Sequence, residues 1–226
     1  MSGKNGKAAI WDVDGTLVDT AELHFQAWQA VCREHGRDFT RNDFAATFGQ
    51  RNPEIIRTLF GERFTEQEIA DLGDRKEVLY RDTAKNGVEL LPGARQLVHD
   101  LHRAGFAQAI GSSAPPANLE LILRLTGIAR YFTAIVSSED TERGKPDPQV
   151  FLLAADRLGV SPPRCVVFED AVAGVEAARA GGMKCVAVRC VGHHSEEKLR
   201  QAGADRVVET LERISAAEIV DMLTSD

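Results

Sequence analysis

Short apolar runs alternate with longer amphipathic segments along most of this chain. The apolar runs have the length and composition of buried strands and lie at Ala8–Val13, Phe106–Ser112, Ala134–Ser137, Cys165–Phe168, Lys184–Val188 and Arg206–Val208. The amphipathic segments predict helices at Ala117–Leu125, Gln149–Leu158, Ala171–Ala180, Ser195–Gln201 and Ala216–Leu223. Strands and helices that alternate at this spacing predict an α/β fold, a doubly wound parallel sheet with helices on both faces.

From Thr20 to about Val88 the strand pattern disappears and only helical patterns remain. The first helix of this interval has a core-facing apolar stripe that consists of Leu23, Ala27, Trp28 and Val31. We predict that Asp19 caps this helix and that Glu22, three residues later, completes a capping box. Further helices are predicted at Arg41–Ala46, Pro53–Phe60, Glu66–Asp71 and Arg75–Ala84.

The interruption predicts two structural parts. A small helical cap domain of residues 20–88 is inserted into a Rossmann-like core of residues 1–19 and 89–226, just before the next core helix. Movement of the cap over the core would need hinges near Thr16–Thr20 and Val88–Pro92.

Composition narrows the range of partners and compartments. The chain has 226 residues, 27 of them basic and 34 acidic, and the net charge is −7. It has no basic stripe, so we expect no nucleic-acid partner and no anionic membrane surface. We also expect no secretory signal and no membrane span. The four cysteines form no CxxC pair and lie among apolar residues, which predicts reduced core cysteines in a cytoplasmic protein.

Polar side chains that could take part in catalysis or ligand binding follow four of the predicted strands. In chain order they are Asp12 and Asp14, Ser112 and Ser113, Lys145, and Glu169 with Asp170. Ligands of open parallel sheets bind at the carboxyl ends of the strands, near the point where the strand order reverses. We therefore expect these groups to meet at one edge of the sheet. Asp12 and Asp14 would face the same pocket because they are two residues apart in an extended segment.

The clustered carboxylates need a counterion. Two carboxylates about 6 Å apart repel each other by roughly 3 kcal/mol at an effective dielectric constant near 20. A divalent cation removes this repulsion, and an all-oxygen set of ligands without His or Cys favours Mg²⁺ over zinc. With Mg²⁺ and Lys145 present, the site would attract a phosphate group.

Each of these motifs also has an ordinary structural interpretation. The pair Asp12 and Asp14 occurs at plain strand-to-turn exits, Ser112 fits a helix cap, and Lys145 fits a solvated surface. Glu169 and Asp170 fit the start of the next helix. The combination favours a catalytic site, because every motif follows a predicted strand in the appropriate order.

Four segments carry a resemblance to the haloacid dehalogenase superfamily of phosphotransferases. They are WDVDGTLVDT, IGSS, GKPDP and VVFEDAVAGVEAARAGGM, and the similarity extends over nearly the whole chain. The helical insertion after the first segment resembles the cap of the subgroup that includes β-phosphoglucomutase and phosphoglycolate phosphatase.

The resemblance implies a role for each residue of these segments that matches a motif of the family. Asp12 is the expected nucleophile that forms an aspartyl-phosphate, and Asp14 is the expected acid and base. Mg²⁺ is expected on Asp12, Asp170 and the backbone carbonyl of Asp14, with Glu169 close by. The transferring oxygens are expected to bind Ser112 and Lys145. Dehalogenation is disfavoured, since it has no use for the second acid and the metal.

The same resemblance marks candidate substrate-binding residues, most of them in the cap. They are Thr20, His24, Trp28, Gly49, Arg51, Asn52, Lys76 and Ser113. Trp28 equally fits the cap core, His24 fits a partly exposed helix position, and Lys76 fits a solvated face.

Two departures from the mutase pattern favour a phosphatase. After its second motif the mutase has a serine, a lysine and an asparagine that grip the distal phosphate, and here those positions are Ala114, Pro115 and Pro116. The mutase's cap arginine is replaced by Asn52, with Arg51 one step earlier. We therefore predict a Mg²⁺-dependent phosphatase of a small phosphorylated metabolite, a sugar or polyol phosphate.

Two alternatives stay open at this point. The first is a phosphosugar mutase of the β-phosphoglucomutase type. The second is a non-enzymatic phospho-acceptor domain like the receiver domains of signalling proteins. Receiver domains have a similar acid cluster, but they are about half as long and lack a helical insertion.

Overall fold

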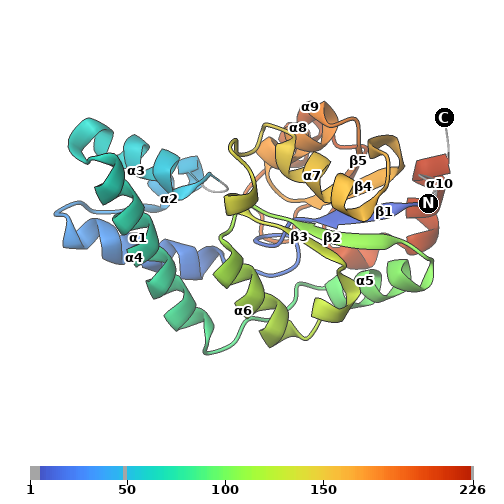
Figure 1. Ribbon diagram of the computed structural model, residues 1–226, viewed down its shortest axis with the longest axis horizontal. Coiled ribbons are helices and arrows are strands. Elements are labelled where there is room, and N and C mark those ends of the chain that lie inside the picture. The colour runs from blue at the N-terminus through green and yellow to red at the C-terminus, as the bar shows by residue number, and fades with distance from the viewer. Residues whose placement is uncertain (1–5, 48–49, 225–226) are drawn as a thin grey trace.

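A parallel sheet of six strands forms the centre of the molecule, in the order β3-β2-β1-β4-β5-β6 (Figure 1). The computed structural model of the chain describes residues 6–47 and 50–224. The strands are β1 (Ala8–Trp11), β2 (Ala107–Gly111), β3 (Ala134–Val136), β4 (Cys165–Glu169), β5 (Lys184–Val188) and β6 (Arg206–Val208). All six predicted strands are present, and their ends differ from the prediction by no more than two residues.

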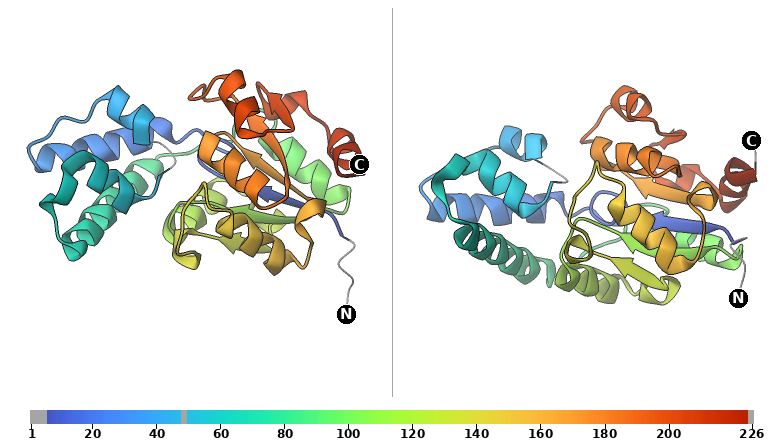
Figure 2. Two further views of the ribbon diagram at one scale, coloured as in Figure 1. Left: turned by 90° about the horizontal axis from the view of Figure 1, so that it is seen from above. Right: turned by 45° about the horizontal axis from the view of Figure 1, so that its top comes forward.

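Helices cover both faces of this sheet. One face packs against α5 (Ala94–Arg103), α6 (Pro116–Thr126) and α10 (Ala216–Thr224), and the other against α7 (Gln149–Leu158), α8 (Val172–Ala180) and α9 (Glu196–Ala202) (Figures 1 and 2). The side chains of β1 alternate between the two layers, because Ala9 and Trp11 join one core cluster while Ala8 and Ile10 join the other. The predicted doubly wound, Rossmann-like fold is confirmed.

The strand order reverses between β1 and β4. Ala8 of β1 is in register with Ala107 of β2 on one side and with Cys165 of β4 on the other. The chain first builds the sheet outward through β2 and β3 and then returns to place β4 beside β1. Crossover connections leave these two neighbours in opposite directions, which opens a crevice at their carboxyl ends.

A separate group of helices lies beyond that edge of the sheet (Figures 1 and 2). It consists of α1 (Ala21–Glu34), α2 (Arg41–Thr47), α3 (Asn52–Phe60) and α4 (Glu66–Ala84). These helices bury their own apolar cluster, rich in aromatic rings, with Phe25, Trp28, Phe39, Phe44 and Ile56 among its members. This packing supports the proposed division into a cap of residues 20–88 and a core of residues 1–19 and 89–226.

Two adjacent chain segments connect the cap to the core. Val18 and Leu90 form an isolated antiparallel bridge, and the Leu91 N–H group donates a hydrogen bond to the Leu17 carbonyl at 2.9 Å. The exit and the return of the chain are therefore tied together on the core side of the cap. Single turns of 3₁₀ helix complete the structure at Gly61–Arg63, Ala129–Tyr131, Ser138–Asp140, Pro162–Arg164 and Leu211–Arg213.

The prediction of two helices at Glu66–Asp71 and Arg75–Ala84 is wrong, because α4 runs through both without a break. Gly73 lies inside this helix, where glycine costs about 1 kcal/mol relative to alanine. Its presence has a packing reason. A Cβ atom at Gly73 would lie 3.3 Å from the Cβ atom of Asn52, so glycine allows α3 to begin close against α4.

The predicted capping box of α1 is also wrong. Asp19 accepts a hydrogen bond from the Ala21 N–H group at 3.1 Å, but Glu22 does not bond back toward the helix start. Glu22 instead forms an ion pair with Arg41 at 2.7 Å, which joins α1 to α2. A capping box does occur at the start of α4, between Thr65 and Glu68.

Three of the four cysteines match their prediction as core residues, and Cys190 is only partly buried. None forms a disulfide, and Cys32, Cys165 and Cys185 are buried. Burial raises the pKa of Cys32 to about 11. Across residues 6–47 and 50–224, no helix combines the length and the apolar character that a bilayer crossing requires.

Candidate active site

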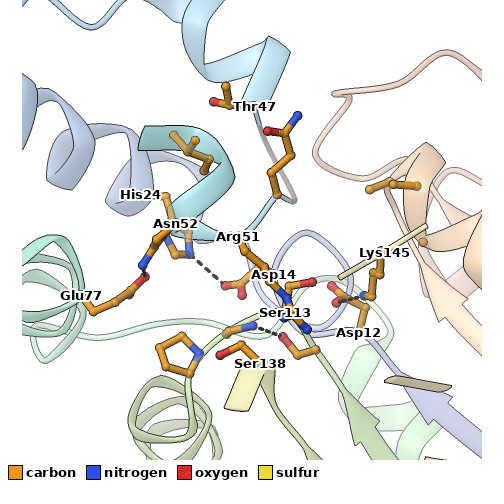
Figure 3. Close-up of a pocket in the computed structure, with 18 of the residues that line it drawn as sticks. Asp12, Asp14, His24, Thr47, Arg51, Asn52, Glu77, Ser113, Ser138 and Lys145 are labelled. Carbon is orange, nitrogen blue, oxygen red and sulfur yellow. Dashed lines mark hydrogen bonds and ion pairs between the residues drawn. The ribbon is translucent and has the colours of Figure 1, made fainter. Parts of the chain in front are cut away.

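The structure brings the polar ends of four strands together around one cavity (Figure 3). The cavity has a volume of about 280 Å³ and lies between the core and the cap. Its core wall includes Asp12, Asp14, Ser112, Ser113, Lys145, Glu169 and Asp170. These are the core residues whose spacing in the sequence predicted a common site.

Lys145 joins two of the acids. Its Nζ atom donates hydrogen bonds to Asp12 Oδ1 at 2.6 Å and to Glu169 Oε1 at 2.7 Å. Burial by itself would lower the pKa of Lys145, but the two carboxylates raise it above its usual value. The lysine therefore stays charged in a site from which water is largely excluded.

Glu169 has both carboxylate oxygens engaged by the protein. While Oε1 accepts from Lys145, Oε2 accepts from the N–H groups of Asp170 and Ala171 at 2.7 Å and 2.6 Å. A Cβ atom at Gly174 would lie 1.8 Å from Oε1, so only glycine leaves room for this carboxylate. These contacts favour Glu169 as the group that positions Lys145 and the loop after β4, more than as a direct metal ligand.

Asp12 and Asp170 are short of positive charge. Burial, together with the neighbouring carboxylates of Glu169 and Asp14, raises the pKa of Asp12 to about 8 against the opposing effect of Lys145. Burial and the charges of Glu169 and Asp12 raise the pKa of Asp170 well above its usual value. Within the described residues, Asp170 Oδ2 is buried and has no hydrogen-bond partner.

The donor set around Asp170 fits a hard divalent cation. A Cβ atom at Gly15, which has φ = 88°, would lie 2.2 Å from the unpartnered Asp170 Oδ2, so this oxygen approaches the backbone of the first motif. The described part of the chain contains no cluster of three or more His, Cys, Asp or Glu ligands that could enclose a metal. Mg²⁺ does not need one, since it commonly binds one or two carboxylates and completes its shell with water and substrate oxygens.

Asp14 has a different environment from Asp12. Its Oδ1 atom accepts from Thr20 Oγ1 at 2.5 Å and lies 3.3 Å from His24 Nε2. Burial by itself would raise the pKa of Asp14, but the hydrogen bonds of His24 and Thr20 and the charge of Lys76 lower it overall. The resting Asp14 side chain is therefore a carboxylate.

Lys76 determines which nitrogen of His24 carries the proton. The Lys76 Nζ atom lies 2.7 Å from His24 Nδ1. An ammonium group can only donate, so Nδ1 accepts and the ring proton resides on Nε2, where it faces Asp14. Tyr80 stacks on the imidazole with ring centroids 4.2 Å apart and holds its plane.

The positive charge of Lys76 is cancelled inside the cap. Lys76 and Glu77 form a buried ion pair at 2.8 Å. Glu77 also accepts from Asn52 Nδ2 at 2.8 Å and, across to the core, from Asn118 Nδ2 at 2.6 Å. Figure 3 shows Asn52 turned toward Glu77 and His24 turned toward Asp14. Sequence reasoning missed Glu77 and Asn118, whose only local signal was the adjacency of Glu77 to Lys76.

Several residues that were predicted to bind substrate are buried and contact other parts of the protein instead. Thr20 is fully buried, bonds to Asp14 and is not among the residues that line the cavity. Trp28 lines the cavity but is only 2% exposed and belongs to the cap core. Lys76 is equally buried, so the interpretation as a solvated lysine is wrong. Asn52 and Ser113 do line the cavity. Gly49 lies outside the described residues.

The remaining predicted residues are Ser112 and Arg51. Ser112 Oγ accepts a hydrogen bond from the Ala114 N–H group at 3.1 Å and keeps its own proton available for a ligand. Arg51 lines the cavity, but its guanidinium donates to the core loop at Thr141, Glu142 and Arg143.

The fold and the site together define an α/β enzyme with a helical cap over an acidic centre. Residues 7–182 match the family model of the haloacid dehalogenase-like hydrolases. The chain belongs to this family of hydrolases, as the four sequence segments indicated. Membership of an enzyme family removes the receiver-domain alternative.

Relatives within the family are both phosphatases and mutases. The chain is 34% identical to the fructose-1-phosphate phosphatase YqaB of Escherichia coli, over 80% of this chain and 95% of that protein. It is 32% identical to the β-phosphoglucomutase of Mycobacterium bovis, over 91% and 90%. The crystal structure of β-phosphoglucomutase from Clostridium difficile superimposes with a TM-score of 0.86 at 26% identity, over 96% of this chain and 97% of that chain.

Proposed function

We propose that this protein is a Mg²⁺-dependent phosphatase that hydrolyses the monophosphate of a small sugar or polyol through an aspartyl-phosphate on Asp12. One observation carries the proposal: the Asp12 carboxylate and Lys145 meet beside an unpartnered Asp170 oxygen at the floor of a cavity whose cap wall contains the cancelled ion pair of Lys76 and Glu77. The relative named for fructose 1-phosphate supports a sugar phosphate as the class of substrate.

Mg²⁺ would bind the carboxylates of Asp12 and Asp170 and the backbone carbonyl of Asp14. When bound, it offsets the excess of negative charge and draws a phosphoryl oxygen into the site. The raised pKa values of Asp12 and Asp170 support this assignment, because burial and the neighbouring carboxylates outweigh the one cation, Lys145, that Asp12 shares with Glu169.

Asp12 would act as the nucleophile toward phosphorus. Lys145, 2.6 Å from its Oδ1 atom, favours the ionised form of Asp12 and also presents positive charge to the transferring phosphoryl group. The Ser112 hydroxyl, whose oxygen is already oriented by the Ala114 N–H group, would donate to a phosphoryl oxygen. Glu169 keeps Lys145 in place during the transfer.

Asp14 would serve both halves of the reaction. The approaching phosphate raises the pKa of Asp14 by like-charge repulsion, so that it carries a proton for the leaving oxygen. Once the alcohol has left, hydrogen bonds from Thr20 and His24 lower the pKa of Asp14 again. It then accepts a proton from the water that attacks the aspartyl-phosphate.

The leaving group of the substrate is expected to be uncharged. The cap wall opposite the acids contains the cancelled pair of Lys76 and Glu77 and the amide of Asn52. Ala114 and Pro115 line the cavity where the mutase resemblance calls for a distal phosphate clamp. A hydroxylated, neutral body fits this wall better than a second phosphate or a carboxylate.

The alternative is a phosphosugar mutase, which the similarity to β-phosphoglucomutase supports. A bisphosphate intermediate would need a second anion site, and the cations nearest the cap wall are already engaged: Lys76 by Glu77 and Arg51 by core carbonyls. These contacts favour hydrolysis.

A direct comparison of products tests the proposal. The protein is incubated with Mg²⁺ and β-glucose 1-phosphate, with and without a trace of glucose 1,6-bisphosphate, and both glucose 6-phosphate and free phosphate are measured. Fructose 1-phosphate and other hexose and polyol monophosphates form the wider panel. We expect free phosphate to dominate. Glucose 6-phosphate formed at a rate far above that of phosphate would establish the mutase instead.

A further inference from the structure

Arg51 reaches from the cap onto one loop of the core (Figure 3). It is the residue directly before α3, and its guanidinium donates to the carbonyls of Thr141 at 3.0 Å, Glu142 at 3.3 Å and Arg143 at 3.0 Å. It also donates to the Thr141 hydroxyl. The acceptors belong to three consecutive residues, which together bind one planar guanidinium group.

This loop leads directly into the catalytic lysine. Arg143 is separated from Lys145 only by Gly144, and a Cβ atom at Gly144 would lie 3.0 Å from Arg51 Nε. The guanidinium therefore packs against the backbone one residue before Lys145. The Nε atom is buried and has no hydrogen-bond partner within the described residues, so the guanidinium is desolvated at this contact.

The contact differs from the other polar contacts between cap and core. His24 lies against Asp14, close in the chain to the first hinge segment. Glu77 and Arg81 bind Asn118 from α4, the helix that leads back into the hinge segment before Leu90. Arg51 lies far along the chain from both hinge segments. The Arg51 contact therefore ties a second part of the cap, the start of α3, to the core.

We propose that Arg51 is a positioning residue that latches the cap onto the Lys145 loop, so that cap closure and the placement of Lys145 occur together. The proposal rests on the proposed phosphatase function for its kinetic consequences, but the latch itself is a property of the two domains. When the cap opens, the carbonyls of residues 141–143 return to water and the loop loses its external support. When it closes, the loop is fixed and Lys145 bridges Asp12 and Glu169.

A latch and a substrate ligand make different kinetic predictions. A latch changes the fraction of closed enzyme, so its loss lowers turnover by the same factor for every substrate. A residue that binds the substrate acts only through the substrate groups that it contacts. If Arg51 were such a residue, its replacement would mainly affect substrates that carry a second phosphate.

The experiment compares Arg51→Ala, Arg51→Lys and Thr141→Val with a matched control, Arg57→Ala. Arg57 lies on the same helix, α3, but pairs with Glu66 at 2.7 Å inside the cap. The values of kcat and KM are measured for three monoesters with different leaving groups, namely a hexose phosphate, glycerol phosphate and phenyl phosphate, and for one sugar bisphosphate. Small-angle X-ray scattering of the same ligand-free proteins reports cap opening without reference to activity.

We expect Arg51→Ala to lower kcat/KM about tenfold to a hundredfold, by the same factor for all four esters, and to increase the radius of gyration. Arg51→Lys should restore part of both effects, since lysine donates from a single point. Thr141→Val should have a smaller effect in the same direction, and Arg57→Ala should resemble the wild type.

Two results would overturn the latch. One is a loss of activity confined to the bisphosphate, which would make Arg51 a substrate ligand. The other is a scattering curve of Arg51→Ala that coincides with that of the wild type. Absence of phosphatase activity in the wild type would contradict the proposed function, while the scattering comparison would still decide whether Arg51 holds the cap closed.

Discussion

The core edge and the cap wall face each other across one cavity and differ in how far their charges are compensated. At the core edge Asp12 and Glu169 share one cation, Lys145, and one oxygen of the neighbouring Asp170 has no partner within the described residues. In the cap wall the charges of Lys76 and Glu77 cancel in a buried pair. Under the proposed function, this difference assigns the metal and the phosphoryl group to the core and the neutral organic body of the substrate to the cap.

The two regions also differ in how their acids titrate. Burial and neighbouring acids raise the pKa of Asp12 to about 8, whereas the charge of Lys76 and the hydrogen bonds of Lys76 and Asn52 keep the pKa of Glu77 low in spite of burial. The core edge thus has an excess of negative charge that an added cation would offset. In the cap wall, the charge of Glu77 is already offset by Lys76. The following predictions test this contrast, from the largest expected effect to the smallest.

The first prediction concerns the nucleophile at the core edge. Asp12→Asn should lower kcat for every phosphate ester by about 10⁴-fold or more, because an amide cannot form the aspartyl-phosphate. The amide has the same shape and removes one charge from a crowded acidic cluster, so the protein should stay folded. Phosphate release and a thermal unfolding curve measure the two outcomes. Substantial phosphatase activity in this variant would mean that Asp12 is not the nucleophile.

The second prediction concerns the cancelled charges of the cap. Lys76→Met should reduce the free energy of unfolding by about 3–5 kcal/mol, because Glu77 is left buried without its cation. The double variant Lys76→Met/Glu77→Gln should be more stable than that single variant. Urea denaturation of both proteins measures the coupling.

Lys85→Met is the matched control for the cap pair. Lys85 directly follows α4 and pairs with Asp82 in solvent, where both side chains are 61% exposed, so its loss should change stability very little. If Lys76→Met were no more destabilising than Lys85→Met, the charge balance of the cap wall would have no structural importance.

The third prediction concerns the metal at the core edge. Asp170→Asn should weaken Mg²⁺ binding by at least about 10-fold to 100-fold, since Asp170 is a proposed direct ligand and the loss of an outer-shell partner already costs this much. For the wild type, Mg²⁺ at 100 times its dissociation constant should stabilise the fold by about 2.7 kcal/mol, and this gain should shrink in the variant. Thermal unfolding at increasing Mg²⁺ concentration tests both statements without any substrate.

Glu120→Gln, an exposed position on α6, is the control for the metal titration. It should leave the response to Mg²⁺ unchanged. Equal stabilisation of wild type and Asp170→Asn by Mg²⁺ would contradict the proposed donor set.

The smallest expected effect lies in the segment that leads from β3 to Lys145. Asp140 accepts from Arg157 at 2.5 Å and from the N–H and hydroxyl groups of Ser137, and these partners lower its pKa to about 2. Its contribution to stability is complete above the unfolded-state pKa, near 4, and is lost as the pH falls toward 2.

Asp140→Asn should therefore cost about 1 kcal/mol or less at pH 7, since both partners are partly exposed. The difference from wild type should stay constant down to about pH 5 and decrease below pH 4. Urea denaturation over this range measures it. A difference that grows as the pH falls would contradict the assigned ion pair.

Much of the fold was predictable because it depends on local patterns. Buried strands of a parallel sheet are continuous apolar runs, and the runs at Ala8–Val13 and Cys165–Phe168 identified β1 and β4 within two residues. The single helix α4 was not predictable from such patterns, since Gly73 reads locally as a break. Its reason is the contact with Asn52 on another helix.

The core half of the candidate site was predictable for a topological reason. Once the strands were placed, the rule for parallel sheets brought Asp12, Lys145 and Asp170 to one edge. The cap half followed no such rule. The sequence analysis assigned no role to Glu77, because its role depends on Asn118, which is 41 residues away in another domain.

The sequence by itself determined the sheet, the order of its motifs and the excess of acid at one edge, because these follow from short-range periodicity and from strand topology. Only the tertiary structure decided how each charge is used. It paired Lys76 with Glu77, left an Asp170 oxygen without a partner, and held Arg51 against three core carbonyls. The physical reason is that hydrogen bonds and ion pairs act over a few ångströms, so their partners depend on how helices and loops pack and not on how far apart residues are in the chain.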